Sequence, residues 1–386
     1  MGKSTGFESL PIELIHRCID LTRPNDPEQR RARHNIKRLV PLTLVAKRWT
    51  VYAQQCLFQN VMLIGPRDVE KFGDALAMIQ GRFETNCLII AGDVTRLAHR
   101  ALTTSGLKAD AKYAELIHRA LNLTMGLQEL RLAPKLIVAP AVLLLENLSH
   151  LRHLTLQCCF MTLEPGAELA ARPTFHLESF TFIPAAGLTQ SSLVNLTTMA
   201  FVEYVLSHSL AGSIKHIEWR HGYADLVAPQ FADLQGTRSY PYLDNWTAAN
   251  PGLEVVCQTL ESFFFPACIQ GPFQSMNTVF ELGRICSLSP RLHTLSINSP
   301  ELQLFTVISM PPPNLEVLIL RQIISISDVL HMLQRYEDAM NNLRKIRTRL
   351  RGPERNEEDW VRLEQYCRSR GIELVHEEAQ VEASAW

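Results

Sequence analysis

The sequence lacks an excess of charge of either sign and has no long apolar run. Its 386 residues include 38 Lys and Arg against 39 Asp and Glu, which gives a net charge of −1. This balance provides no basic surface of the kind that binds nucleic acid or anionic membranes. No segment approaches the roughly 18 consecutive apolar residues of a membrane-spanning helix. Neither nucleic acid nor a membrane is therefore an expected partner.

Several signatures of catalytic and cofactor sites are missing as well. The sequence contains no His-Glu-x-x-His, no Cys-x-x-Cys and no glycine-rich dinucleotide-binding loop. Gly2-Lys3-Ser4-Thr5 matches the end of a phosphate-binding loop, but the glycine and the strand that must precede it are absent. We therefore expect no cofactor and no metal site, and we expect that the chain is not an enzyme. A hydrolase site hidden in the long connections is the alternative.

The 9 cysteines are odd in number and scattered, with one adjacent pair at 158–159. Because no apolar signal-type segment opens the sequence, we expect reduced thiols and a cytoplasmic or nuclear location. Most cysteines are then small buried hydrophobic side chains. His16 lies close to Cys18, and His150 and His153 precede the pair. We interpret these residues as surface histidines and core cysteines rather than metal ligands, since they interleave with helix and repeat patterns.

Two N-terminal segments show the apolar spacing of helices. In the first, Pro11 suits the first turn, where a missing N–H costs nothing, and Glu13 suits the helix dipole there. The apolar residues that follow share one helical face: Leu14, Ile15, Cys18 and Ile19. In the second segment, helical spacing links Leu42, Val45 and Trp49. Residues 61–64 are then predicted to form a first strand.

The order of these features resembles an F-box. The Leu10-Pro11 opening, the amphipathic helix, the segment Leu44-Val45-Ala46-Lys47-Arg48-Trp49 and the trailing Leu57-Phe58 before a strand all follow the family's order. The stretch from about residue 22 to 37 is longer than the family's usual connection. The resemblance implies that residues 1–64 form a helical F-box that binds the Skp adaptor of a Skp–cullin–F-box ubiquitin ligase.

The resemblance also implies which residues contact the adaptor. The set that we expect at this contact is Leu10, Pro11, Ile12, Leu14, Ile15, Ile19, Val45 and Trp49. The alternative is an ordinary helical cap whose apolar residues face the core of a larger domain.

One short phrase recurs after residue 120. The phrase has six residues, and its first, fourth and sixth residues are apolar. Its seven copies begin at Leu127, Leu151, Leu177, Ile214, Leu260, Leu292 and Leu315. This phrase is similar to the core of leucine-rich repeats. Its last three positions predict a short strand with alternate side chains buried. We therefore expect burial, in successive parallel strands, of Leu130, Leu154, Phe180, Ile217, Phe263, Leu295 and Leu318.

The predicted fold class is α/β, with the helical F-box followed by an irregular leucine-rich-repeat solenoid over residues 65–376. Copies of the phrase are between 23 residues apart (Leu292 to Leu315) and 46 residues apart (Ile214 to Leu260), against a norm of about 20–29. We expect the parallel sheet on the concave side and helices on the convex side. Helices are expected over the ranges 113–121, 188–206, 329–346 and 359–370, a last strand at 372–375, and a disordered tail at 377–386.

Two features of the repeat region bear on binding. The basic run 344–351 is interpreted as the cationic end of the helix ending near 346, with an acidic partner as the alternative. A long aromatic connection carries Tyr240, Tyr242 and Trp246, which we expect to contact a protein substrate. The alternative is that these aromatics only close the core of an oversized repeat.

The combined resemblance implies an F-box receptor. Its partners are the Skp-type adaptor, through it a cullin ligase, and an unknown protein substrate. The alternative function is a leucine-rich-repeat protein-interaction scaffold that does not engage a ubiquitin ligase.

Overall fold

The structure is a computed structural model that describes fifteen segments of the chain. They are residues 11–22, 40–41, 47–79, 83–92, 104–133, 137–138, 140–157, 160–161, 174–183, 213–219, 251–266, 285–298, 311–323, 326–350 and 357–376. The helix expected at 188–206 and the tail expected at 377–386 lie outside these residues. The chain divides into two compact units, with the division near Leu177. Each unit is described by itself.

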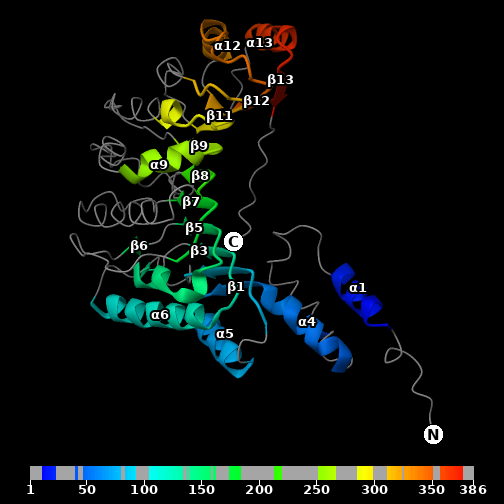
Figure 1. Ribbon diagram of the computed structural model, residues 1–386, viewed down its shortest axis with the longest axis vertical. Helices are drawn as coiled ribbons and strands as arrows, with labels where there is room; N and C mark the ends of the chain where they lie inside the picture. The colour runs from blue at the N-terminus through cyan, green and yellow to red at the C-terminus, as the bar shows by residue number, and fades with distance from the viewer. Residues whose placement is uncertain are drawn as a thin grey trace. The chain divides into compact units, whose positions relative to one another are not determined.

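Unit 1 alternates helices and strands along the chain (Figure 1). Its α-helices are α1 (Ile12–Thr22), α4 (Lys47–Gln59), α5 (Pro66–Ile79) and α6 (Thr104–Leu123), and its 3-10 helices are η3 (Pro140–Leu144) and η4 (Glu146–Leu148). Its strands are β1 (Asn60–Ile64), β2 (Cys87–Ala91), β3 (Glu129–Leu132), β4 (Ile137–Val138), β5 (His153–Gln157) and β6 (Phe160–Met161). The predicted helix at 113–121 is thus confirmed as part of α6.

Unit 2 is richer in strands. They are β7 (Ser179–Ile183), β8 (His216–Trp219), β9 (Ser262–Pro266), β10 (Thr294–Asn298), β11 (Val317–Ile323), β12 (Lys345–Leu350) and β13 (Glu373–His376). The described helices are α9 (Pro251–Thr259), α12 (Ile326–Arg335) and α13 (Glu357–Ser369). The last of these and β13 confirm the helix expected at 359–370 and the strand expected at 372–375.

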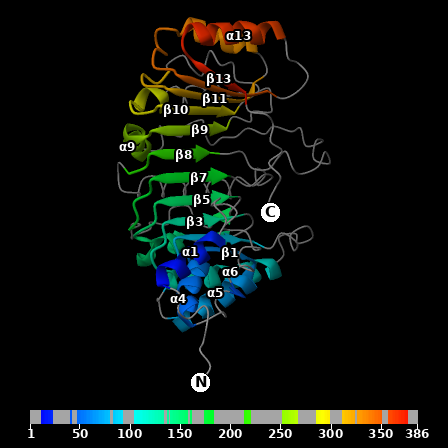
Figure 2. The ribbon, with the colours of Figure 1, turned by 90° about the vertical axis from the view of Figure 1, so that its right-hand side faces the viewer.

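The strands form an α/β architecture with a long parallel sheet. In unit 1 the strand order is β1-β2-β3-β5, in unit 2 it is β7-β8-β9-β10-β11-β12-β13, and β4 pairs with β6 in a separate two-stranded sheet. Within each unit every neighbouring pair of the long sheet is parallel, and Figure 2 shows the strands of unit 2 pointing the same way. The predicted α/β class and the parallel strands are therefore confirmed, and the architecture is compatible with a solenoid. Since β1 pairs with β2, the sheet begins before the boundary expected at residue 64.

The core follows the repeated phrase. The seven residues expected to be buried, from Leu130 to Leu318, are each at most 3% exposed. In unit 2 they lie in one register row, in which Phe180 pairs with Ile217, then Phe263, then Leu295. The prediction of burial in successive strands is confirmed, because the phrase places its fourth residue at the same register position in each strand.

From β7 to β12, each strand is also held to the next by a repeated pair of backbone hydrogen bonds. The carbonyl of Glu261 accepts from the N–H groups of His293 and Thr294, at 3.1 and 3.2 Å. The carbonyl before each neighbouring strand accepts in the same way; in unit 2 these acceptors are Glu178, Lys215, His293 and Glu316. This paired bond fixes the register at the start of each strand, whatever the length of the connection between strands.

One predicted element is wrong. The helix expected over 329–346 ends at Arg335, and the basic run that was assigned to its end forms β12 instead. Within β12 the side chains of Ile346 and Thr348 are 0% and 1% exposed. The segment Lys-Ile-Arg-Thr-Arg-Leu alternates with period two, which favours a strand with one buried face.

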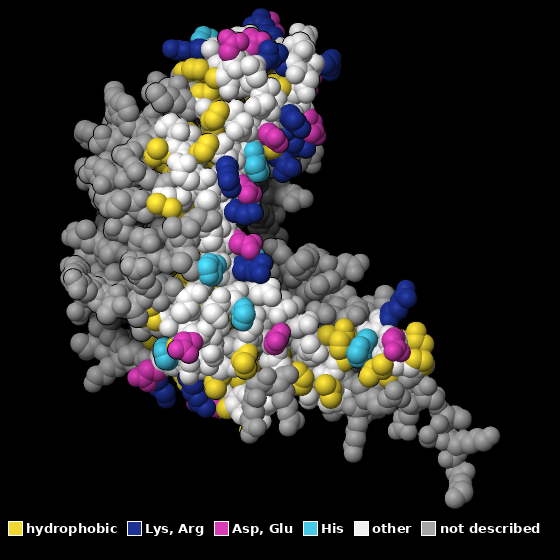
Figure 3. Space-filling view, in the orientation of Figure 1, with side chains coloured by type: hydrophobic (Ala, Val, Ile, Leu, Met, Phe, Trp, Pro, Cys, Tyr) yellow, Lys and Arg dark blue, Asp and Glu magenta, His cyan; other side chains and the backbone are white. Residues whose placement is uncertain are grey.

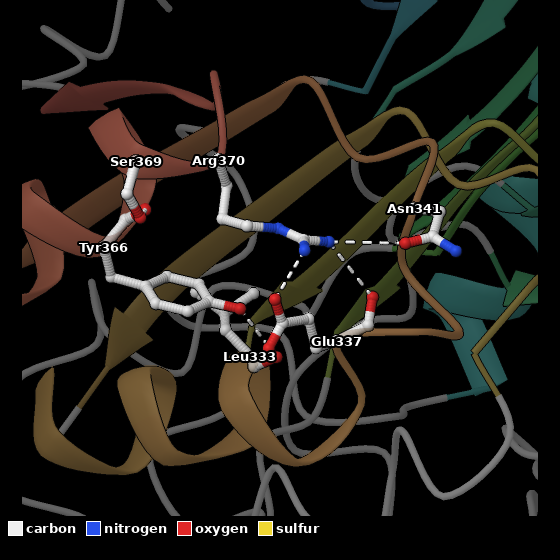
Figure 4. Close-up of polar contacts among 6 residues, drawn as sticks. All are labelled: Leu333, Glu337, Asn341, Tyr366, Ser369 and Arg370. Atoms are coloured by element: carbon white, nitrogen blue, oxygen red, sulfur yellow. Dashed lines mark hydrogen bonds and ion pairs between the residues drawn. The ribbon is translucent and has the colours of Figure 1, made fainter.

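Polar contacts link α12 and the residues that follow it to α13 and Arg370 (Figure 4). The guanidinium of Arg370 donates to the side chain of Glu337, to its carbonyl and to Asn341 Oδ1. The hydroxyl of Tyr366 donates to the carbonyl of Leu333 at 3.1 Å. Burial, then the charge of Glu337, raises the pKa of Tyr366, so this hydroxyl keeps its proton and remains a donor.

The turn after α13 needs a glycine. Gly371 has φ +68 and follows α13 after one residue, Arg370. Its N–H donates to the carbonyl of Arg368, and the N–H of Ile372 donates to that of Cys367 at 2.8 Å. This is the Schellman arrangement, which satisfies the last carbonyls of a helix and turns the chain into β13.

Candidate interaction surfaces

Helices α1 and α4, which we call the helical pair, share a small core. Ile15 and Ile19 of α1 are fully buried against Ala53 and Cys56 of α4. The imidazole of His16 stacks on the ring of Tyr52 with their centroids 3.7 Å apart. The first turn of α1 is set by Pro11, whose carbonyl accepts from the N–H groups of Leu14 and Ile15. The amphipathic spacing in the sequence thus produces a helix packed along one side.

The first turn of α1 carries three exposed apolar residues, Pro11, Ile12 and Leu14, which we call the α1 patch. Ile12 is 44% exposed and Leu14 is 47% exposed, and Pro11 is exposed as well. On α4, Val51 is 63% exposed. Figure 3 shows hydrophobic side chains gathered on the surface of this segment. These exposed apolar side chains make the start of α1 a candidate interaction surface.

The structure separates the residues that were expected to contact an adaptor. Those of the α1 patch are exposed, whereas Ile15 and Ile19 form the core of the helical pair. Leu10 and Val45 lie outside the described residues, as does the side chain of Trp49. The sequence alone did not distinguish the two groups, because apolar residues cover more than one side of α1.

In unit 2 the sheet face opposite the core presents two register rows, which we call the outward rows. The first contains Ser179, His216, Ser262, Thr294, Val317, Lys345 and Glu373. The second contains Thr181, Glu218, Phe264, Ser296, Ile319, Arg347 and Val375, of which Ser296 is buried. Cross-strand contacts within them include His216 Nδ1 to Ser262 Oγ at 2.8 Å and Lys345 Nζ to Glu373 Oε2 at 2.9 Å.

The outward rows are mixed in character. Neutral polar groups prevail on β7 and β8, and half-buried apolar side chains appear at Phe264, Val317 and Ile319. An ion pair joins Lys215 and Glu261, just before β8 and β9, with the atoms 3.3 Å apart. A sheet face that presents polar, charged and apolar groups at fixed spacing suits recognition of another chain.

Most of the described cysteines lack the exposure of reactive thiols. Cys18 is exposed, and the other described cysteines are buried: Cys56, Cys87, Cys257, Cys286 and Cys367. Burial raises the pKa of Cys286 to about 12 and that of Cys367 to about 11. These two thiols stay protonated near neutral pH and are poor nucleophiles. Most of the described cysteines are therefore small core side chains, as predicted.

Two further observations concern ligands and membranes. Among the described residues, no three His, Cys, Asp or Glu side chains are grouped so that they could hold a metal ion. In the same part of the chain, no helix combines the length and the apolar character that crossing a bilayer requires.

The aromatic residues expected to contact a substrate, Tyr240, Tyr242 and Trp246, lie outside the described residues. No protein-family model matches the sequence, and no curated protein matches it.

Proposed function

We propose that the chain is the substrate-recognition subunit of a Skp–cullin–F-box ubiquitin ligase. In this proposal the helical pair binds the Skp adaptor, and the strand-repeat region, an irregular leucine-rich-repeat solenoid, binds a protein substrate. Ubiquitin transfer is then catalysed by other subunits, and this chain contributes proximity. Its place of action is the cytoplasm, the nucleus or both.

The observation that carries the proposal is the α1 patch. α1 buries Ile15 and Ile19 within the helical pair, so Ile12 and Leu14 are left as apolar side chains without a role in that core. The patch begins at Pro11, the second residue of the Leu-Pro opening that resembles an F-box. The exposed apolar residues of α1 and the strand-repeat sheet are different parts of the chain, and this supports separate roles in adaptor binding and substrate binding.

The decisive test is a charge in the α1 patch. Burying a leucine side chain in an interface contributes roughly 1.5–3 kcal/mol, and a buried carboxylate opposes binding further. Leu14→Asp should therefore abolish co-purification with the purified Skp adaptor. Met78→Asp is the matched control, because Met78 is 83% exposed on α5, outside the helical pair. The control should retain the adaptor.

Two results would contradict the proposal. If the unmodified chain fails to bind the adaptor, the scaffold function replaces the ligase function. If the chain binds and Leu14→Asp binds equally well, the adaptor contact lies elsewhere. Circular dichroism should show the same helical content in both variants, so that loss of binding is not loss of folding.

Substrate binding is proposed for the outward rows and for the connection that carries Tyr240, Tyr242 and Trp246. Aromatic side chains combine apolar area with a polar group and are favoured in interfaces. Once a substrate is known, Tyr242→Ala and Trp246→Ala should weaken its capture and leave adaptor binding unchanged. Normal capture by both folded variants would remove this connection from the site.

A further inference from the structure

Strand β13 lies at the end of the unit 2 sheet and has one neighbour among the described residues. It pairs with β12, and no described strand follows it (Figure 2). Successive residues of a strand direct their N–H and C=O groups to opposite edges. The N–H of Glu373 donates to the carbonyl of Arg344, so the backbone groups of Leu374 and His376 point to the other edge. In the described part of unit 2 this other edge, which we call the β13 edge, has no partner.

The β13 edge repeats the acceptor that joins the earlier strands. From β7 to β12, one carbonyl at each boundary accepts two N–H groups of the next strand, as Glu316 does from Arg344 and Lys345. Ile372 has the corresponding position before β13, because Glu373 is the register partner of Lys345. No N–H of a described residue donates to the carbonyl of Ile372. The β13 edge therefore offers the same acceptor to one further parallel strand.

The register row that forms the core of unit 2 is incomplete at β13. In the two preceding strands this row contains Leu318 and Ile346, which are both 0% exposed. Leu374 is the next residue of the row, in register with Ile346, and it is only half-buried. An apolar side chain on a further strand would cover Leu374, and such burial favours binding in proportion to the apolar area removed from water.

Glu373 adds a charge to the β13 edge. Its side chain is 61% exposed, and its Oε2 atom lies 2.9 Å from Lys345 Nζ on the β12 side. A carboxylate accepts hydrogen bonds at both oxygens, so Oε1 can accept from a second cation. The strand that fits best therefore has a Lys or Arg opposite Glu373 and an apolar residue directly after it, opposite Leu374.

Both ends of β13 are held in place within the chain itself. The Schellman turn at Gly371 positions its start. At its end the imidazole of His376 lies edge-on to the ring of Trp360 in α13, with the ring centroids 5.6 Å apart. A strand that is already ordered loses less conformational entropy on binding than a disordered segment does.

Charge distinguishes the possible occupants of the β13 edge. The segment that follows β13, residues 377–386, contains three Glu and no Lys or Arg, so it lacks the cation. Two copies of β13 can pair antiparallel, with Leu374 opposite Leu374. This register places Glu373 opposite Val375, because opposed residues share a face, and again provides no cation. A basic segment of another protein is therefore the occupant that fits.

We propose that the β13 edge binds an extended segment of a partner protein, which adds to the sheet as a parallel strand and carries a Lys or Arg directly followed by an apolar residue. The basic residue lies opposite Glu373, and the apolar residue covers Leu374. This inference goes beyond the proposed function, because it requires neither the helical pair nor the adaptor.

The test uses the full chain and short fluorescein-labelled synthetic peptides, with anisotropy as the readout. The parent peptide carries Lys-Leu-Val between threonines, which favour an extended conformation. It should bind saturably. A second peptide with Glu in place of Lys should bind more weakly than the parent, because its carboxylate lies opposite that of Glu373.

Methylation of the peptide backbone tests strand addition itself. In the proposed register the N–H of the peptide Lys faces β13, just as the N–H of Lys345 faces β11, and the N–H of the peptide Leu faces away. N-methylation at Lys removes a hydrogen bond and places a methyl group at the contact, so it should weaken binding by about tenfold or more. N-methylation at Leu is the matched control and should leave binding unchanged.

An exchange of charge locates the site. Glu373→Lys should weaken binding of the parent peptide by about threefold to tenfold, and this variant should prefer the Glu peptide to the parent. Glu358→Lys is the matched control, since Glu358 also forms an ion pair and its side chain is 75% exposed on α13. This control should bind both peptides like the unmodified chain.

Three results with the peptides would overturn the proposal. They are the absence of saturable binding by the parent peptide, equal losses for the two N-methylated peptides, and equal losses for Glu373→Lys and Glu358→Lys. Two further results would assign the β13 edge to another occupant. Tighter peptide binding after removal of residues 377–386 would identify that segment, and a dimer in sedimentation that the peptide dissociates would identify a second copy.

Adaptor co-purification separates this proposal from the proposed function. Glu373→Lys should keep the adaptor, and Leu14→Asp should keep the parent peptide. Failure of one proposal therefore leaves the measurement of the other intact.

Discussion

The helical pair and the sheet of unit 2 bury their apolar residues in different ways. The helical pair has four buried core residues and leaves Ile12, Leu14 and Val51 more than 40% exposed. The sheet instead repeats one buried position in every strand, as at Phe180, Phe263 and Leu318. The helical pair therefore has apolar surface left for another protein, whereas the sheet completes its core within the chain.

The largest effect that we predict concerns the sheet core. Phe263→Ala should lower the free energy of unfolding by about 3–5 kcal/mol, since Phe263 is 2% exposed in the middle of its row. Urea unfolding of the full chain, followed by circular dichroism, measures the loss. Phe264→Ala is the matched control, because Phe264 is half-buried on the other face of the same strand. Equal losses of stability for Phe263→Ala and Phe264→Ala would mean that the two faces of β9 contribute equally to the core.

A second prediction separates core from surface within α1. Ile15→Ala should destabilise the helical pair by about 2–5 kcal/mol, whereas Leu14→Ala should change stability by less than about 0.5 kcal/mol. Hydrogen exchange of the α1 and α4 amides measures both effects. The unit 2 amides should be unaffected by either change. Faster amide exchange in Leu14→Ala would show that Leu14 belongs to the core of the helical pair and not to the α1 patch.

A third prediction is a gain in stability. The hydroxyl of Thr348 is buried and has no hydrogen-bond partner among the described residues. Leaving such a group unpaired costs about 1–3 kcal/mol, so Thr348→Val should stabilise unit 2. Thr294→Val is the control, because the Thr294 hydroxyl contacts His293 Nδ1 at 3.1 Å. Thermal unfolding should show a higher midpoint temperature for Thr348→Val alone. A lower midpoint for Thr348→Val would mean that the Thr348 hydroxyl forms a hydrogen bond.

The smallest effect concerns the surface of the same sheet. The pair of Lys345 and Glu373 is partly exposed, so its coupling free energy should be about 0.2–1 kcal/mol and should decrease as salt is added. A double-mutant cycle with Lys345→Gln and Glu373→Gln measures it. A coupling that is larger and insensitive to salt would indicate that the outward face is shielded from water.

The sequence predicted the strands whose anchor positions are apolar and missed those with threonine there. In the copy of the phrase at β2 the first residue would be Thr85, and in the copy at β12 the sixth residue would be Thr348. Both threonines are buried, at 0% and 1% exposure, and neither hydroxyl has a hydrogen-bond partner among the described residues. A search for apolar residues passes over these strands, although the threonine methyl groups fill the same positions.

The candidate surfaces were predicted only in part. Apolar spacing identified α1, but the division between buried Ile15 and exposed Leu14 depends on where α4 packs. Strand β12 was not predicted, because its basic residues were interpreted as the end of a helix. Its neighbours, such as Ile319 beside Arg347, come from residues far apart in the chain. Local patterns therefore gave the elements, and tertiary pairing determined which side chains share a face.

The paired backbone bonds at the strand starts have a mechanical consequence. In unit 2 each boundary between neighbouring strands from β7 to β12 carries one such carbonyl, as at Glu178, Lys215 and Glu261. A pull from β7 toward β13 lies along these hydrogen bonds and loads the boundaries in series, because each strand bonds only to its neighbours. Under tension the sheet should yield one boundary at a time at low force. It would behave as an extensible spring rather than as a rigid block.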